Sequence, residues 1–185
     1  MAKKFIGAVL GIGVIFGAGG AANAAYIDAA TNQVVASGTG DLVIVFNGHT
    51  ASHSNNLVSP DFAGILFNNH GSAVGDTVNM GAFLAGEVIE FQINNLTTGF
   101  TYVTGLAADN FDNVLHAILT ANPDGSITVG FEDLKGGGDR DYDDLVFTIY
   151  ETVADVVETP LPAAGVLMMA GLAGFGFASR KRRAL

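Results

Sequence analysis

The sequence contains no cysteine and no tryptophan, and only eight of its 185 residues are basic. The absence of cysteine excludes disulfide bonds and any metal site with thiolate ligands. The body of the chain also lacks a G-x-S-x-G elbow, an H-E-x-x-H pair and a phosphate-binding loop, which are signatures of common enzyme classes. These absences favour a protein that is not an enzyme.

Basic residues are also absent from most of the interior of the chain. The first four and the last six residues hold six of the eight, whereas all 18 acidic residues lie between Asp28 and Glu158. That segment has only Lys135 and Arg140 as basic residues, so its formal charge is −16. Such a surface repels nucleic acid and attracts cations, and we therefore expect no nucleic-acid partner.

The N-terminus, residues 1–24, has the three parts of a secretory signal peptide. It begins M-A-K-K, continues with an uncharged, glycine-rich apolar stretch and ends with an A-x-A site at Ala22–Ala24. We expect signal peptidase to act here, so that the mature chain begins near Ala25. An uncleaved membrane anchor is the alternative, although the apolar stretch is short for a membrane span.

A second uncharged stretch, residues 161–179, lies near the C-terminus. At about 1.5 Å per residue, a helix of this length just crosses a hydrocarbon core of roughly 30 Å. The basic run R-K-R-R follows directly, and basic residues stay on the cytoplasmic side of a membrane. The stretch is therefore predicted to be a transmembrane helix that leaves the body of the protein outside, as the signal peptide does.

The run P-L-P-A-A that begins at Pro160, with the apolar span and the basic cluster after it, resembles the PEP-CTERM class of bacterial sorting signals in its VPLPA-type variant. Thr159 stands where that variant usually has valine. The resemblance implies that residues 158–185 are a sorting signal that an exosortase-type membrane protease recognises through Pro160, Leu161 and Pro162. It also implies export across the inner membrane of a Gram-negative bacterium, transient anchoring there and release to the cell surface or medium. A permanent transmembrane anchor is the alternative.

Short strand patterns between the two ends predict an all-β fold. Apolar runs and period-two alternation alternate with turn clusters such as Asn122–Gly125. The segment 48–81 is harder to interpret, and we expect loops there with one strand. We predict a single antiparallel β-sandwich over residues 25–157, of the jelly-roll or immunoglobulin-like kind. The expected strands lie near residues 41–46, 63–67, 89–94, 114–120 and 126–131. Residues 41–46 are apolar on both faces, which predicts a buried strand, whereas residues 89–94 alternate with period two, which predicts one wet face.

The most acidic segment, residues 132–144, connects two strand patterns that can pair as an antiparallel hairpin. Glycines 136–138 allow the later aspartates to fold back toward the strand ends. Two like charges about 4 Å apart cost about 1–4 kcal/mol near a protein surface, and a divalent cation reverses that energy. The predicted metal ligands are Glu132, Asp133, Asp139, Asp141, Asp143 and Asp144.

Calcium is the predicted ion, with a structural role, because it takes six to eight oxygen ligands in flexible geometry and this loop offers only oxygens. The D-x-D-x-D run that begins at Asp139 is similar to the first half of an EF-hand loop, but the sixth position is Asp144 instead of glycine. The alternative is a solvated acidic loop that Lys135 and Arg140 partly neutralise.

The same segment resembles the DUF4114 domain of secreted bacterial proteins, over roughly residues 78–150. The shared motifs are G-A-F-L-A-G-E from Gly81, N-F-D ending at Asp112 with His116 after it, and F-E-D-L-K-G-G-G-D-R-D-Y-D-D-L-V-F from Phe131. The resemblance implies a β-rich exported module, often proposed to bind calcium, without an agreed activity. It points to the acidic loop and, more weakly, to Asp112 and His116.

The histidines offer a weaker signal for metal. His49 and His53 are four residues apart and could ligate a metal from a helix, but their segment is rich in turn residues. We therefore expect these two and His70 to be solvent-exposed. His116 lies in an apolar strand pattern, and we expect it to be a hydrogen-bonded structural residue.

These observations predict an exported, non-catalytic, calcium-stabilised protein of the cell surface or extracellular matrix, with no catalytic residues. The alternative is a calcium-dependent carbohydrate-binding module whose partner is extracellular polysaccharide, although few aromatic platforms are evident. A glycoside-active enzyme is disfavoured, because that mechanism needs an acid and a base held apart across a cleft rather than six acids on one loop.

Overall fold

The computed structural model describes residues 25–38 and 40–152. The predicted signal peptide and the predicted sorting signal with its transmembrane segment lie outside these ranges. Within them, no helix is long and apolar enough to cross a membrane. The one helix of the described residues is the short 3₁₀ turn η1 (Ala107–Asp109).

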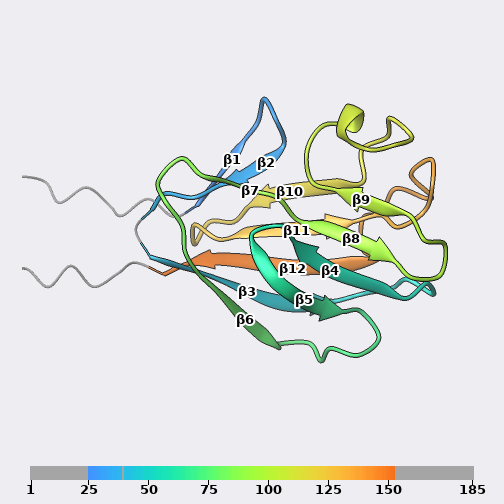
Figure 1. The fold of residues 1–185 in the computed structure, drawn as a ribbon, viewed down its shortest axis with the longest axis horizontal. Coiled ribbons are helices and arrows are strands. Elements are labelled where there is room, and N and C mark those ends of the chain that lie inside the picture. Colours follow the sequence, from blue (N-terminus) through green and yellow to red (C-terminus); the bar gives the residue numbers. More distant parts are fainter. Residues whose placement is uncertain (1–24, 39, 153–185) are drawn as a thin grey trace, which may run out of the picture. The chain divides into compact units, whose positions relative to one another are not determined.

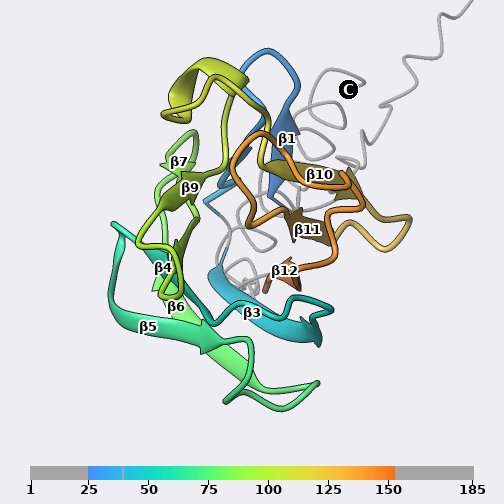
Figure 2. The same cartoon turned by 90° about the vertical axis from the view of Figure 1, so that its right-hand side faces the viewer.

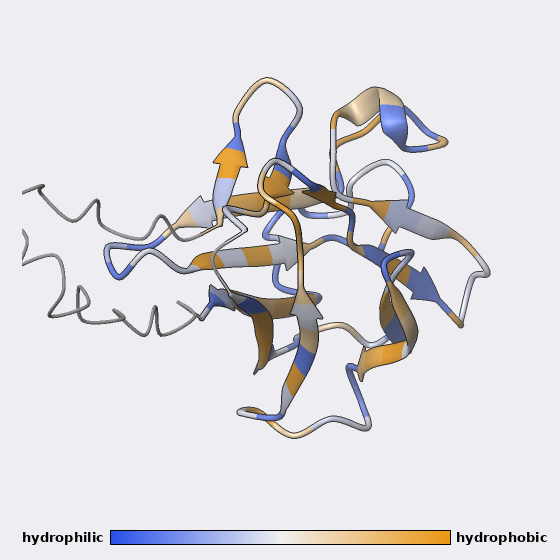
Figure 3. Ribbon diagram, turned by 60° about the vertical axis from the view of Figure 1, so that its left-hand side comes forward, coloured by the Kyte–Doolittle hydropathy of each residue, from blue (hydrophilic) through white to orange (hydrophobic). Residues whose placement is uncertain are grey.

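The predicted all-β class is confirmed, because strands make up nearly all regular structure of the described chain and every pairing is antiparallel. Apolar residues lie mostly along the strands (Figure 3). The strands are β1 (Tyr26–Asp28), β2 (Gln33–Val35), β3 (Asp41–Gly48), β4 (Asn55–Ser59), β5 (Phe62–Asn68), β6 (Thr77–Ala82), β7 (Val88–Ile89), β8 (Gln92–Asn95), β9 (Thr101–Val103), β10 (Ala117–Ala121), β11 (Ile127–Phe131) and β12 (Leu145–Glu151).

The strands form three sheets, in the orders β10-β11-β12-β3-β6, β5-β4-β8-β9 and β1-β2-β7 (Figure 1). In Figure 2, β10, β11, β12 and β3 form one layer, and β9, β4 and β5 lie in the layer that faces it. Aromatic pairs join the layers: the ring centroids of Phe46 and Phe67 are 5.4 Å apart, and those of Phe91 and Phe147 are 4.9 Å apart. The hydrophobic core therefore lies between the five-stranded and the four-stranded sheet.

The segment 48–81 contains more regular structure than the single predicted strand. It holds β4, β5 and most of β6. β4 cannot be recognised from the sequence pattern, because it begins with two asparagines, which have low strand propensity. Asn55 and Leu57 nevertheless share the buried face of β4, and the pairing of this strand with both β5 and β8 stabilises it.

Two predicted strands differ in detail from the structure. Residues 89–94 show the expected alternation of buried and partly exposed positions, but the chain changes sheet at Glu90 and Phe91, between β7 and β8. Residues 41–46 are not buried on both faces: Leu42, Ile44 and Phe46 enter the core, whereas the intervening valines are half-buried on the outer face of β3.

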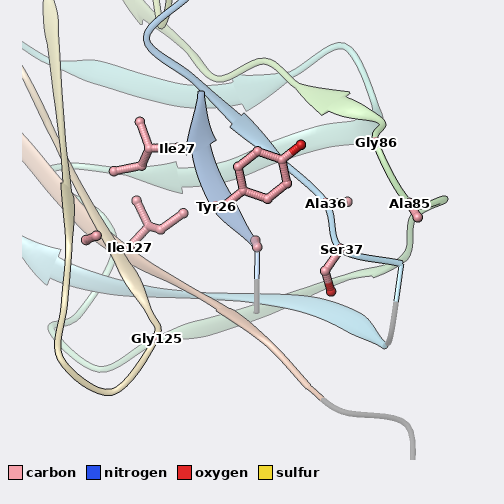
Figure 4. A pocket seen from close by; sticks show the side chains of 10 residues that line it. Tyr26, Ile27, Ala36, Ser37, Ala85, Gly86, Gly125 and Ile127 are labelled. Carbon is pink, nitrogen blue, oxygen red and sulfur yellow. The ribbon is translucent and has the colours of Figure 1, made fainter. Parts of the chain in front are cut away.

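A hollow of about 800 Å³ lies beside β1 (Figure 4). Tyr26, Ile27, Ala36 and Ile127 contribute to its lining, and the described lining residues include no acidic, basic or histidine side chain. Titratable and metal-ligating groups gather instead in and around the loop between β11 and β12.

Candidate metal site

The acidic loop is the connection of the β11–β12 hairpin, as predicted. Phe131 pairs with Leu145, so residues 132–144 form the whole connection. The loop folds back over β11. The carbonyl oxygen of Tyr142 lies so close to Gly130 that a Cβ atom on this residue would clash with it. Any larger residue at position 130 would push the loop away from the strand.

The six predicted ligands differ in exposure to solvent, which determines how much free energy each negative charge costs. Carboxylates at the strand ends are enclosed by protein, whereas those at the tip of the loop face solvent. Glu132 and Asp133 are buried, Asp143 and Asp144 are half-buried, and Asp139 and Asp141 are exposed.

Five of the six acids form two overlapping groups. Oxygens of Glu132, Asp133 and Asp144 lie within 4.8 Å of one another, and we refer to these residues as the buried group. Oxygens of Glu132, Asp139 and Asp141 satisfy the same limit and form the exposed group. Glu132 belongs to both groups and lies at the centre of the cluster.

The structure places Asp143 outside both groups. The Thr50 hydroxyl donates a hydrogen bond to Oδ1 of Asp143, and the Thr50 N–H donates to its carbonyl oxygen at 2.9 Å. These bonds tie Asp143 to the segment after β3 instead of to the hairpin.

The charges of the buried group are met by neutral donors. The N–H groups of Leu134 and Arg140 donate to Glu132 at 3.3 and 3.1 Å, and the N–H of Asp133 donates to Asp144 at 2.8 Å. Among the described residues, no lysine or arginine side chain forms an ion pair with a carboxylate. Lys135 instead lies 6.0 Å from the centre of the Phe111 ring.

This arrangement makes ionisation of the buried group unfavourable. Burial, with a contribution from the charge of Asp144, raises the pKa of Glu132 to about 7. Burial and the charge of Asp133 likewise raise the pKa of Asp144. A cation among these oxygens would remove the penalty, because it would replace repulsion between carboxylates by attraction.

Asn55 of β4 adds a neutral oxygen to the buried group. Its side chain is fully buried, and its Nδ2 donates to Oδ2 of Asp133 at 2.5 Å. The Oδ1 of the same amide is buried and has no hydrogen-bond partner among the described residues. An unpaired buried amide oxygen costs free energy unless a ligand or water meets it.

Asn95 of β8 and His53, which precedes β4, both contact Asp133, and Nδ1 of His53 lies 3.5 Å from Oδ1 of Asp133. Nδ2 of Asn95 donates to the carbonyl oxygen of Asp133 at 3.0 Å and lies 2.9 Å from Nδ1 of His53. Asn55 and Asn95 are opposite one another in the β4–β8 pairing. The site therefore joins the hairpin of the five-stranded sheet to two strands of the four-stranded sheet.

His116 and Asp112 lie beneath the loop and belong to neither carboxylate group. His116 is fully buried, as expected for a structural residue, although it precedes β10 by one residue. Its Nδ1 lies 2.9 Å from the carbonyl oxygen of Glu132, and its Nε2 lies 3.1 Å from Oδ2 of Asp112. That oxygen also accepts the N–H of Gly136 at 2.8 Å, so this pair positions the loop.

The pKa of Asp112 shows the strength of these contacts. Burial alone would raise it, but the hydrogen bonds from Gly136 and His116 outweigh burial and hold the pKa below its usual value. Tyr102 packs on His116 with ring centroids 3.9 Å apart, and its buried hydroxyl has no partner among the described residues. Burial and the nearby charge of Asp112 raise the pKa of Tyr102 to about 12.

Sequence reasoning missed Asn55, Asn95 and Tyr102 as members of this site. One signal was present in N-N-L-V-S, where Asn55 occupies the same face as Leu57 and is therefore a polar residue at a core-facing position. The signal becomes visible only when residues 55–59 are known to be a strand.

The fold and the site define an all-β domain with an acidic hairpin loop that is buried at its strand ends and exposed at its tip. A family model described as a domain of unknown function, DUF4114, matches residues 36–152, which is 117 of the 185 residues. The chain belongs to the DUF4114 family. The match begins well before residue 78, where the predicted resemblance starts, and it includes β4 with Asn55. No curated protein and no solved structure matches the chain.

Proposed function

We propose that this protein is an exported, non-catalytic surface or extracellular-matrix protein whose DUF4114 domain, a β-sandwich of the jelly-roll or immunoglobulin-like kind, is stabilised by calcium. The observation that carries the proposal is the buried group. Three carboxylates lie within 4.8 Å of one another without a lysine or arginine partner among the described residues. The amide of Asn55, whose Oδ1 is unpaired among the described residues, contacts one of them, Asp133, through its Nδ2.

The donors of this group fit calcium. Glu132, Asp133, Asp144 and Asn55 supply carboxylate and amide oxygens, which are the ligands that calcium prefers. One imidazole adjoins the buried group, since Nδ1 of His53 lies 3.5 Å from Oδ1 of Asp133. The other donors are oxygens, which favour calcium over zinc. Asp139 and Asp141 would share Glu132 with a second, more exposed ion.

Calcium at the buried group would act as a clamp between the layers of the fold. Its ligands come from the β11–β12 hairpin on one side and from β4 on the other. Binding to the folded chain alone adds about 2.7 kcal/mol of stability when free calcium is 100 times the dissociation constant.

Thermal unfolding of the purified protein, in calcium and in a chelator of divalent cations, tests this proposal. We expect a midpoint higher in calcium by on the order of 10 °C. Magnesium at the same concentration is the control, and we expect it to give a smaller shift because it favours a stricter octahedron with fewer protein ligands. Equal midpoints in calcium and chelator would contradict the proposal.

The export part of the proposal rests on the sequence of the two ends. The A-x-A site at Ala22–Ala24 supports processing by signal peptidase, and the P-L-P-A-A run with its apolar span and R-K-R-R cluster supports recognition by an exosortase-type protease. Mass spectrometry of the protein recovered from its host provides the test. We expect both ends to be missing, and an intact R-K-R-R end would contradict the sorting signal.

A calcium-dependent carbohydrate-binding module is the second proposal. The rings of Phe100 and Phe111 stack with centroids 4.7 Å apart, and both side chains are partly exposed beside Asp112, which holds the acidic loop. Exposed aromatic surfaces of this kind can stack on sugar rings. Glycan-array binding that is lost in Asp141→Ala would support this function, and an array without binding in calcium would exclude it for the glycans tested.

A further inference from the structure

We infer that the protein has a further cation site, distinct from both acidic groups, at which His49 and His70 bind a divalent transition metal such as Zn²⁺. The two histidines line one pocket of about 620 Å³ at the end of β3. Their ring centroids are 4.7 Å apart, although 20 residues separate them in the sequence. The fold therefore pairs His49 with His70, and not with His53 as the four-residue spacing would suggest.

The hydrogen bond of His70 leaves one ring nitrogen free for a metal. Its Nε2 lies 3.0 Å from the carbonyl oxygen of His53, and a carbonyl can only accept, so Nε2 carries the proton. Nδ1 of the neutral ring then presents a lone pair. Histidines that bind metals commonly donate their other ring nitrogen to a carbonyl or carboxylate in this way, which fixes the tautomer.

His49 supplies the second nitrogen. Its Nδ1 is buried and has no hydrogen-bond partner among the described residues. A buried ring nitrogen without a partner costs free energy, and the neighbouring imidazole of His70 makes no hydrogen bond with it. A metal ion between the two rings would satisfy both free nitrogens.

Asp143 offers a third ligand from the same pocket. The Thr50 hydroxyl donates a hydrogen bond to its Oδ1, so Oδ2 would be the oxygen that binds an ion. Asp143 lies outside both groups of acids, so its use here does not compete with calcium. Coordination by all three residues requires the Asp143 side chain to turn toward the rings, and it would leave a fourth position for water.

The donor set selects the class of metal. Imidazole nitrogens suit zinc, copper and nickel, whereas calcium and magnesium prefer oxygen ligands. The two sites should therefore be separable by the choice of ion. This inference does not depend on the proposed calcium function, because it uses different residues and a different metal.

Zinc titration of the purified full chain by calorimetry, in saturating calcium, tests the inference. We expect one zinc ion per chain, with affinity at least 10-fold weaker in His49→Ala and in His70→Ala and reduced to a smaller extent in Asp143→Asn. His53→Gln is the matched control: its side chain does not line the pocket, so zinc affinity should stay within about 2-fold.

Two results would overturn the inference. One is the absence of zinc binding to the wild-type chain, and the other is zinc binding that survives both histidine substitutions but is lost in Glu132→Gln, which would place zinc in the acidic loop. His70 is exposed, so His70→Ala should fold even if His49→Ala does not. If the melting temperature of His70→Ala still rises in calcium, the variant is folded. Co²⁺ absorption bands that are present in the wild-type chain and absent in His70→Ala would report nitrogen coordination independently.

Discussion

The two halves of the acidic loop contrast sharply although they contain the same kind of residue. Asp133 and Asp144 lie at the strand ends, are at least half-buried and are held by hydrogen bonds from the facing sheet or the hairpin itself. Asp139 and Asp141 lie at the tip and face solvent. Water screens the tip charges but not the buried ones, so the same negative charge costs far more at the strand ends.

This difference shows that burial, more than the number of carboxylates, determines where a cation matters for stability. Six acids in thirteen residues suggest one crowded site, but the fold separates them into a buried group, an exposed group and Asp143. Glu132 links the two groups. A substitution can therefore remove a ligand from one of the two groups and leave the other group intact.

The largest effect should come from Glu132→Gln compared with Asp141→Asn. Glu132→Gln removes a ligand from both groups. Most of the stabilisation by calcium, about 2.7 kcal/mol when free calcium is 100 times the dissociation constant, should therefore be lost. Asp141→Asn leaves the buried group whole and should keep most of this stabilisation. The measurement is chemical denaturation of each variant in calcium and in chelator. Equal losses in the two variants would contradict the division of the loop.

A slightly smaller effect is expected for Asn55→Ala. The substitution removes the amide oxygen proposed as a ligand and leaves Asp133 without its donor, at a cost of about 1–3 kcal/mol. Asn56→Ala, at the next position of β4 and half-buried, is the control: it removes the hydrogen bond from Nδ2 of Asn68 and should cost about 0.5–1.5 kcal/mol without affecting calcium. Urea denaturation measures both costs, and titration of each variant with calcium should show weaker binding only in Asn55→Ala.

A smaller effect still should separate Gly138→Ala from Gly136→Ala. Both glycines have positive φ, at +37° and +84°, so alanine at either position carries backbone strain of about 1–2 kcal/mol. A Cβ atom on Gly138 would also lie 2.7 Å from Cδ of Glu132, whereas one on Gly136 would meet nothing within 4 Å. Calcium affinity measured by calorimetry should therefore fall in Gly138→Ala only. A similar fall in both would mean that strain, and not displacement of Glu132, is responsible.

The smallest effect should be a pH dependence in chelator, because one carboxyl group exchanges less than one proton between pH 6 and 8. Glu132 has a pKa of about 7 in the folded chain against an ordinary value of 4.5, so the folded chain binds more protons between these values. The free energy of unfolding should therefore decrease as pH rises from 4.5 to about 7, and it should level off at higher pH. Calcium should oppose this decrease, and Glu132→Gln should flatten it in chelator; an increase of stability with pH in chelator would contradict the raised pKa.

Much of the domain could be predicted from local patterns. The β11–β12 hairpin follows from two short apolar strands around a glycine-rich acidic loop, and the DUF4114 match follows from the motif in that loop. Strands β4 and β6 could not be predicted, because their sequences are rich in asparagine, glycine or methionine and long-range pairing stabilises them.

The contacts between residues far apart in the chain also could not be predicted from the sequence. Asn55 meets Asp133 across 78 positions, and Thr50 meets Asp143 across 93. Spacing along the chain paired His49 with His53, whereas the fold pairs it with His70. Local sequence identifies groups that can bind an ion, but the partners of those groups depend on how the sheets pack.

A crystal structure of the protein grown with calcium tests the central claim most directly. We expect one ion coordinated by Glu132, Asp133, Asp144 and Oδ1 of Asn55, at distances of about 2.3–2.6 Å. An acidic loop with the same side-chain positions and no ion at the buried group, in crystals saturated with calcium, would contradict the account.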